Sequence, residues 1–216
     1  MKLLRSLLVL LLSISFFSGI VHAADSSNLK EMDYLKKIDL IHLDLKEGLS
    51  PTLKTGDLNS DFLNQLTQYH QGWITLAKND LQYGERKALK EPINQIVHGL
   101  KLNLNKISKL QKKLNENLIY DEAKEATYLS SYDWIYQQTL NELKNEGDVP
   151  TTLIGDSIDF DFLTRLAKQM EVFNSFVDNF TEQTENEQVK ALALEIKKEV
   201  NELKNEVTDL INKIKA

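Results

Sequence analysis

The chain has 216 residues, a formal net charge of −6 from 26 Lys and Arg against 32 Asp and Glu, and no cysteine. An acidic chain does not attract phosphate backbones, so the composition argues against nucleic acid as a partner. The absence of cysteine excludes disulfides and thiolate nucleophiles, so the fold has to be stabilised by burial alone.

The N-terminal segment predicts export. Lys2 and Arg5 precede an apolar run over 7–20, and Val21-His22-Ala23 follows with a small residue at its last position. This pattern is typical of a secretory signal peptide over residues 1–23, with cleavage after Ala23. A membrane anchor is the alternative, but a span needs roughly 20 apolar residues, more than this run supplies. We therefore expect a periplasmic or secreted protein, with no membrane segment after cleavage.

The rest of the chain predicts an all-α fold. Apolar residues recur every three or four positions, and no run alternates with period two. Two segments, 48–51 and 147–150, begin with Gly and end with Pro, which is a common helix stop signal. Asn59 or Ser60 is expected to cap the second helix, and Asp159 the fifth. The predicted helices span 29–47, 59–82, 86–117, 121–145, 159–183 and 185–215.

The two halves of the chain resemble each other. GLSPTLKTGDLNSDFLNQL (48–66) and GDVPTTLIGDSIDFDFLTRL (147–166) share Gly, Pro, Thr, Gly-Asp and Asp-Phe-Leu in the same order. Aligned without a gap, 61–114 and 161–214 have 11 identities in 54 pairs. Average composition would give roughly three or four. We infer a tandem duplication that forms tandem helical bundles, with about three main helices per repeat. The repeats span 24–117 and 118–216.

The junction between the repeats lacks helix-breaking residues. No Gly or Pro occurs between Gly99 and Gly147. We therefore expect the third and fourth helices to run into each other with only a bend near 115–121, which would join the two bundles stiffly.

Two histidines fall on the apolar stripes of the predicted helices. The stripes are Leu35, Ile38, His42, Leu45, Leu49 and Leu63, Leu66, His70, Trp73, Ala77. Both histidines should therefore face inward on helices that pack against each other. Such a pair could clamp one metal ion, supply a catalytic base, or form neutral core imidazoles bonded to each other or to Tyr69, Gln71 or Asp39. His98 shares its face with polar residues and is expected on the surface.

The first repeat resembles a known family. The stretches are MDYLKKIDLIHLDLKEGL at 32–49 and TGDLNSDFLNQLTQYHQGWITLAKNDLQYGERKALKEPINQIV at 55–97. They resemble the ferritin-like "domain of unknown function 305" family, which includes periplasmic copper-binding proteins. That family carries Met-His on one helix and His-His-Gln on the next, with further methionines around them. The resemblance implies an exported, ferritin-like bundle with a metal site, and does not imply an enzyme.

Carried over to this chain, the family pattern selects His42 and His70 as metal ligands. Gln71 also matches, and Tyr69 replaces the first histidine of the pair. The methionines around these positions are aliphatic residues in the first repeat. Thioethers favour Cu(I), whereas imidazole suits zinc or Cu(II), so we expect weak binding of copper or zinc with little selectivity. In the second repeat the equivalents are Asn141 for His42, Gln169 for Tyr69, Met170 for His70 and Glu171 for Gln71.

Other chemistry has no motif in the sequence. A di-iron carboxylate bundle needs Glu three residues before His, but Asp39, Thr67 and Gln95 stand there. No phosphate-binding glycine loop or nucleophile elbow occurs, so we do not expect an enzyme.

Two functions follow from the sequence. One is a divergent periplasmic metal-binding or metal-stress protein that uses His42 and His70. The other is a non-enzymatic interaction or scaffold protein whose metal site has decayed. An apolar stripe from Leu192 to Ile214 could contact a protein partner or a second copy of the chain, or could belong to the bundle core.

Overall fold

The structure, a computed structural model, describes residues 18–114, 116, 120–142 and 152–215. Most of the predicted signal peptide, 1–23, lies outside these ranges. No helix within them is both long and apolar enough to cross a membrane.

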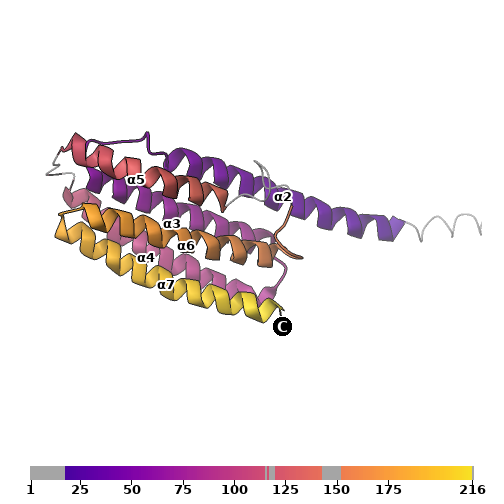
Figure 1. The fold of residues 1–216 in the computed structure, drawn as a ribbon. Helices are drawn as coiled ribbons and strands as arrows, with labels where there is room; N and C mark the ends of the chain where they lie inside the picture. Colours follow the sequence, from indigo (N-terminus) through magenta and orange to yellow (C-terminus); the bar gives the residue numbers. More distant parts are fainter. Residues whose placement is uncertain (1–17, 115, 117–119, 143–151, 216) are drawn as a thin grey trace, which may run out of the picture.

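The described part of the chain is all-helical and contains no strand, which confirms the predicted fold class. Each half supplies three main helices, as predicted. The first of the described helices begins at residue 18 rather than at the predicted residue 29, and its N-terminal part projects beyond the bundle (Figure 1). The elements are α2 (Ser18–Gly48), α3 (Leu58–Tyr83), η1 (Lys87–Leu89), α4 (Lys90–Leu114), α5 (Glu122–Asn141), α6 (Ile158–Gln183) and α7 (Glu187–Lys215).

The helices lie in three layers of two: α2 with α5, α3 with α6, and α4 with α7 (Figure 1). The two helices of each pair are antiparallel, because residues later along one helix contact residues earlier along the other. In the central layer, the Phe62 ring stacks on Phe180 at 3.6 Å between centroids, and Trp73 packs edge-on against Phe173 at 5.1 Å. In the outer α4/α7 layer, Lys106 forms an ion pair with Glu195 at 2.9 Å.

Buried apolar side chains from both halves form one continuous core cluster. The helices α3 and α6 supply most of its large aromatic rings. The two halves therefore stabilise each other across the α3/α6 layer, and each half has its largest apolar face covered by the other.

The duplication read from the sequence has a counterpart in the helices. Both α3 and α6 have 26 residues, and their ends differ by 100 residues in number. Gly56 and Gly155 precede these helices with φ of +90° and +79°, a backbone region that favours glycine. The shared Gly-Asp of the two sequence stretches thus marks the same turn in each half.

The first helices of the two halves align differently from the sequence prediction. Their buried positions match at an offset of 94 residues: 34, 35, 38, 41, 42 and 45 against 128, 129, 132, 135, 136 and 139. Tyr136, rather than the predicted Asn141, therefore stands at the position of His42. The sequence prediction applies the offset of the glycines before α3 and α6 to α2 as well. The segments between the first two helices differ in length, 49–57 in the first half and 142–157 in the second, so this offset does not hold in α2.

The helix caps lie before the predicted ones. Asp57 caps α3 and Ser157 caps α6, each accepting a hydrogen bond from the backbone N–H three residues on, at 2.8 and 3.3 Å. The predicted caps Asn59, Ser60 and Asp159 already lie inside the first turn, so they were wrong as caps.

The junction between α4 and α5 is a break, so the expected continuous helix is wrong. Helix α4 ends at Leu114, and Asp121 caps a new helix by accepting a hydrogen bond from the Lys124 N–H at 3.0 Å. The Asp121 N–H donates to the Gly56 carbonyl at 3.0 Å. A side-chain cap and a contact with a distant loop start α5 without any Gly or Pro at the junction.

Candidate functional site

His70 is a core histidine on α3. Its side chain is fully buried, and its Nδ1–H donates to the Leu66 carbonyl at 2.8 Å. Because a carbonyl only accepts, Nδ1 carries the proton and Nε2 keeps a lone pair. The ring packs against Trp73 and Phe173, at 5.4 and 6.0 Å between centroids.

Burial keeps this imidazole neutral. Removal from water lowers the pKa of His70 to about 4, and the hydrogen bond to Leu66 opposes this only in part. Nε2 has no hydrogen-bond partner among the described residues. His70 therefore offers one bare nitrogen donor inside an aromatic pocket, without an acidic group bonded to it.

His42 is also buried, with 4 % of its surface exposed, as the apolar stripe predicted. The side chain of His70, however, points away from α2, the helix that carries His42. Gly72 faces α2 so closely that a Cβ there would lie 2.7 Å from Leu45. His70 lies two residues earlier, which turns it by about 200° around the helix and away from α2. Its ring contact with Phe173 on α6 agrees with that direction.

The two remaining predicted ligands point elsewhere. Tyr69 is fully buried, and its hydroxyl bonds to the Thr139 hydroxyl of α5 at 2.5 Å. Burial raises the pKa of Tyr69 well above its usual value, so it stays a neutral phenol. Gln71 is exposed.

The predicted donor set therefore does not fit one shared copper or zinc ion. A firm zinc or copper site uses three or four converging ligands, but the Tyr69 hydroxyl is bonded to Thr139 and Gln71 is exposed, so neither joins His70. Within the described ranges, no group of three or more His, Asp or Glu side chains is arranged to hold a metal. His98 is exposed, as expected.

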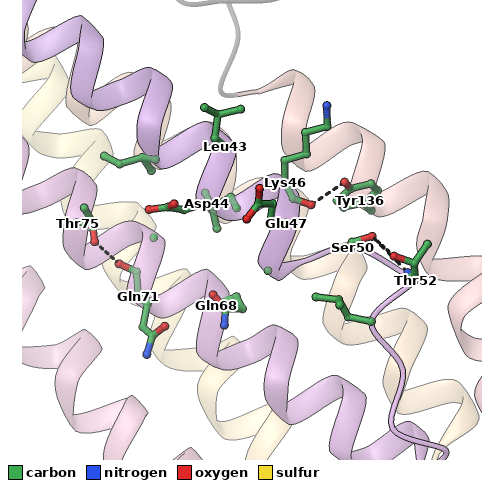
Figure 2. A pocket seen from close by; sticks show the side chains of 15 residues that line it. Leu43, Asp44, Lys46, Glu47, Ser50, Thr52, Gln68, Gln71, Thr75 and Tyr136 are labelled. Carbon is green, nitrogen blue, oxygen red and sulfur yellow. Dashed lines mark hydrogen bonds between the residues drawn. The ribbon is translucent and has the colours of Figure 1, made fainter.

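A groove between α2 and α3 forms a surface hollow of about 920 Å³ (Figure 2). Gln71, at its edge, is the one predicted ligand that reaches it. The groove has a mixed lining of leucines, carboxylates, amides and hydroxyls. Those used below are Leu43, Leu53, Asp44, Glu47, Gln68, Gln71 and Thr75.

Two glycines set the close approach of α2 and α3 beside this groove. A Cβ at Gly48 would lie 2.6 Å from the Gln68 amide oxygen, and one at Gly72 would lie 2.7 Å from Leu45. The helices can therefore pack with little space between their backbones. Tyr136 of α5 closes one end of the groove, where its hydroxyl donates to the Lys46 carbonyl at 2.8 Å (Figure 2).

The outer side of α2 exposes large apolar residues, and one of them, Leu43, lines this groove. They are Leu29, Met32, Leu40 and Leu43, with exposed fractions of 55, 45, 58 and 46 %. We call this set the α2 outer face. Leu53, 58 % exposed, also lines the groove. At about 100° per residue, the four residues of the α2 outer face lie within less than a third of the helix circumference. The sequence contained this signal, because Leu40 and Leu43 do not fit the buried series through His42.

Comparison of the chain with protein-family models, curated proteins and solved structures found no match. The resemblance to the "domain of unknown function 305" family therefore stays a prediction that depends on the motif alone.

Proposed function

We propose that this exported protein is a non-enzymatic binding or scaffold protein, and that a segment of a partner protein docks in the α2–α3 groove. The observation that carries the proposal is the α2 outer face beside the groove. Single exposed leucines are common on protein surfaces, but several on one side of one helix next to a hollow are typical of an interaction site.

The lining of the groove argues for an extended peptide as the occupant. Leu43 and Leu53 offer apolar contact, while Gln68, Gln71 and Thr75 can hydrogen-bond a peptide backbone. Asp44 and Glu47 project from α2 toward the same space (Figure 2). We therefore infer a partner segment with an apolar residue flanked by a basic one.

Copper or zinc binding by His42 and His70 is the competing proposal. It depends on the family resemblance, and the bare Nε2 of His70 is the observation that favours it. The direction of His70, which points away from the helix that carries His42, favours the groove instead.

Site-specific photocrosslinking tests the groove. A benzophenone amino acid at Leu43 or Leu53 is expected to give a discrete adduct with another protein in cells that express the full chain. The same probe at Leu102 of α4 and Leu194 of α7, both 48 % exposed, provides matched controls and should give none. The identified partner should then bind the purified protein, and Leu43→Glu should weaken that binding at least tenfold, whereas Leu102→Glu should not.

Three results would contradict the proposal. They are equal crosslinking from all four positions, no adduct from Leu43 and Leu53, and adducts only with a second copy of the chain. The last result would assign the α2 outer face to a homodimer.

A further inference from the structure

Two buried carboxyl groups from different halves meet at the start of α3. Asp61 in the first turn of α3 is 1 % exposed, and Glu125 in the first turn of α5 is 2 % exposed. The two carboxyl groups meet at one turn, because the neighbouring N–H groups of Thr55 and Gly56 donate to one each. Two buried carboxylates at one site without a cation repel each other, which favours a proton shared by the pair.

Both carboxyl groups also hold the loop that precedes α3. The Thr55 N–H donates to Asp61 Oδ1 at 2.9 Å, and the Gly56 N–H donates to Glu125 Oε1 at 2.5 Å. The Gly56 carbonyl in turn accepts from the Asp121 N–H at 3.0 Å. The Thr55–Gly56 turn is thus fastened to α3 by one acid and to α5 by the other.

The second half has the same loop contact but a different source of charge balance. There the Ile154 N–H donates to Asp161 Oδ1 at 2.6 Å, as Thr55 does to Asp61. Arg165 binds both oxygens of Asp161, with Nε–Oδ2 at 2.7 Å and Nη2–Oδ1 at 2.9 Å. Arg165 is fully buried, so its charge lies in the core beside Asp161.

The first half has no such cation. Gln65 stands where Arg165 stands, 3 % exposed, and lines the same cavity of about 320 Å³ as Asp61. Gln65 Oε1 accepts a hydrogen bond from the Tyr128 hydroxyl, and its Nε2 has no partner among the described residues. The amide therefore does not replace the guanidinium.

The other ionisable groups around the pair do not supply the missing charge. From the loop, Lys54 lines the cavity, but its side chain is exposed to water. From α5, Tyr128 is a buried phenol, and burial raises its pKa well above the usual value. Asp57 and Asp121, the caps of α3 and α5, are acids themselves.

We propose that Asp61 and Glu125 form a proton-dependent latch. The latch holds the Thr55–Gly56 turn in place while the pair shares a proton, and the turn is freed when both groups ionise. Two buried carboxylates without a counter-ion repel each other strongly, and the exposed turn is the element that can move to admit water. The cavity beside the latch shares Gly48, Ser50, Leu53 and Gln68 with the α2–α3 groove. The latch stands whether or not the groove binds a partner.

The direction of the proton equilibrium supports the latch. Burial, and then the neighbouring Glu125 carboxyl group, raise the pKa of Asp61 from 3.8 to about 7. The folded protein therefore binds more protons than the unfolded chain between about pH 4 and 7, and this site loses stabilisation as the pH rises through that window. Asp80, whose pKa burial also raises to about 7, has the same sign, and His70 has the opposite sign. Global stability thus mixes three groups, and a local readout is needed.

Hydrogen exchange at single amides gives that readout. After correction for intrinsic exchange rates, protection of the Thr55 and Gly56 amides is expected to fall at least tenfold between pH 6 and pH 8. The Ile154 amide is an internal control, because Arg165 supplies its site with a permanent charge, and its protection should not change.

Two variants test whether the proton is responsible. Gln65→Arg copies the second half and should keep the two amides protected at pH 8. Glu125→Gln removes one of the two charges and should also abolish the pH dependence. The proposal is overturned if wild-type protection is equal at both pH values, or if both variants, folded by circular dichroism, keep the wild-type pH dependence.

Discussion

Replacing Arg165 with methionine is expected to lower the free energy of unfolding by about 3–5 kcal/mol, because Asp161 would keep its charge in the core without a counter-charge. Both side chains are fully buried, and the Tyr34 hydroxyl of α2 also donates to Asp161 Oδ2 at 2.7 Å. The lost ion pair would therefore loosen the contact between α2 and α6 as well. Urea unfolding at pH 7, followed by circular dichroism, measures the loss.

Two further variants separate the charge from the packing. Asp161→Asn combined with Arg165→Met removes both charges and should regain part of the lost stability. Gln65→Met at the equivalent position of the first half removes a neutral side chain and should cost only about 1–3 kcal/mol. A loss below about 1 kcal/mol for Arg165→Met, or a double variant no more stable than the single one, would contradict the buried charge pair.

Phe62→Ala is expected to lower the free energy of unfolding by about 3–5 kcal/mol, because it opens a cavity in the aromatic centre of the bundle. The centroid of the Phe62 ring lies 3.6 Å from the ring centroid of Phe180 and 4.9 Å from that of Phe176, both on α6. Since these contacts join the two halves, both halves should lose stability together in a single unfolding transition. Denaturation monitored by circular dichroism and by amide exchange in α3 and α6 checks this.

Phe160→Ala provides the control for residue type. Phe160 is half-buried near the start of α6, where the Lys215 ammonium lies 5.3 Å from its ring centroid, and its loss should cost less. Two separate transitions, with α6 keeping its protection in Phe62→Ala, would mean that the halves are independently stable bundles.

The helices could be predicted because each one has its own apolar period. Their arrangement could not, because a period shows which side of a helix is buried but not which helix covers it. Tyr69 illustrates this, since its ring packs against Phe173 of α6 while its hydroxyl bonds to Thr139 of α5. The break at Asp121 could not be predicted for a related reason. The Asp121 N–H donates to the Gly56 carbonyl, which is 65 positions away in the sequence.

The candidate site was harder to predict than the fold. Burial of His42 and His70 followed from their spacing, but the direction of His70 could not, because it depends on Gly72 being the residue of α3 that lies against Leu45 of α2. The Asp61–Glu125 pair joins positions that no local pattern relates, and only the comparison of Gln65 with Arg165 across the duplication could have indicated a missing charge.

Metal titration of the purified protein tests most directly whether function lies at the surface or in the paired histidines. Cu(I), Cu(II) and Zn(II) would be titrated under competition against the wild type, His42→Ala and His70→Ala. The account predicts that neither substitution changes metal binding, and that His70→Ala instead lowers the free energy of unfolding. One ion bound with micromolar or tighter affinity, and lost in both variants, would contradict it and return the protein to the metal-binding class.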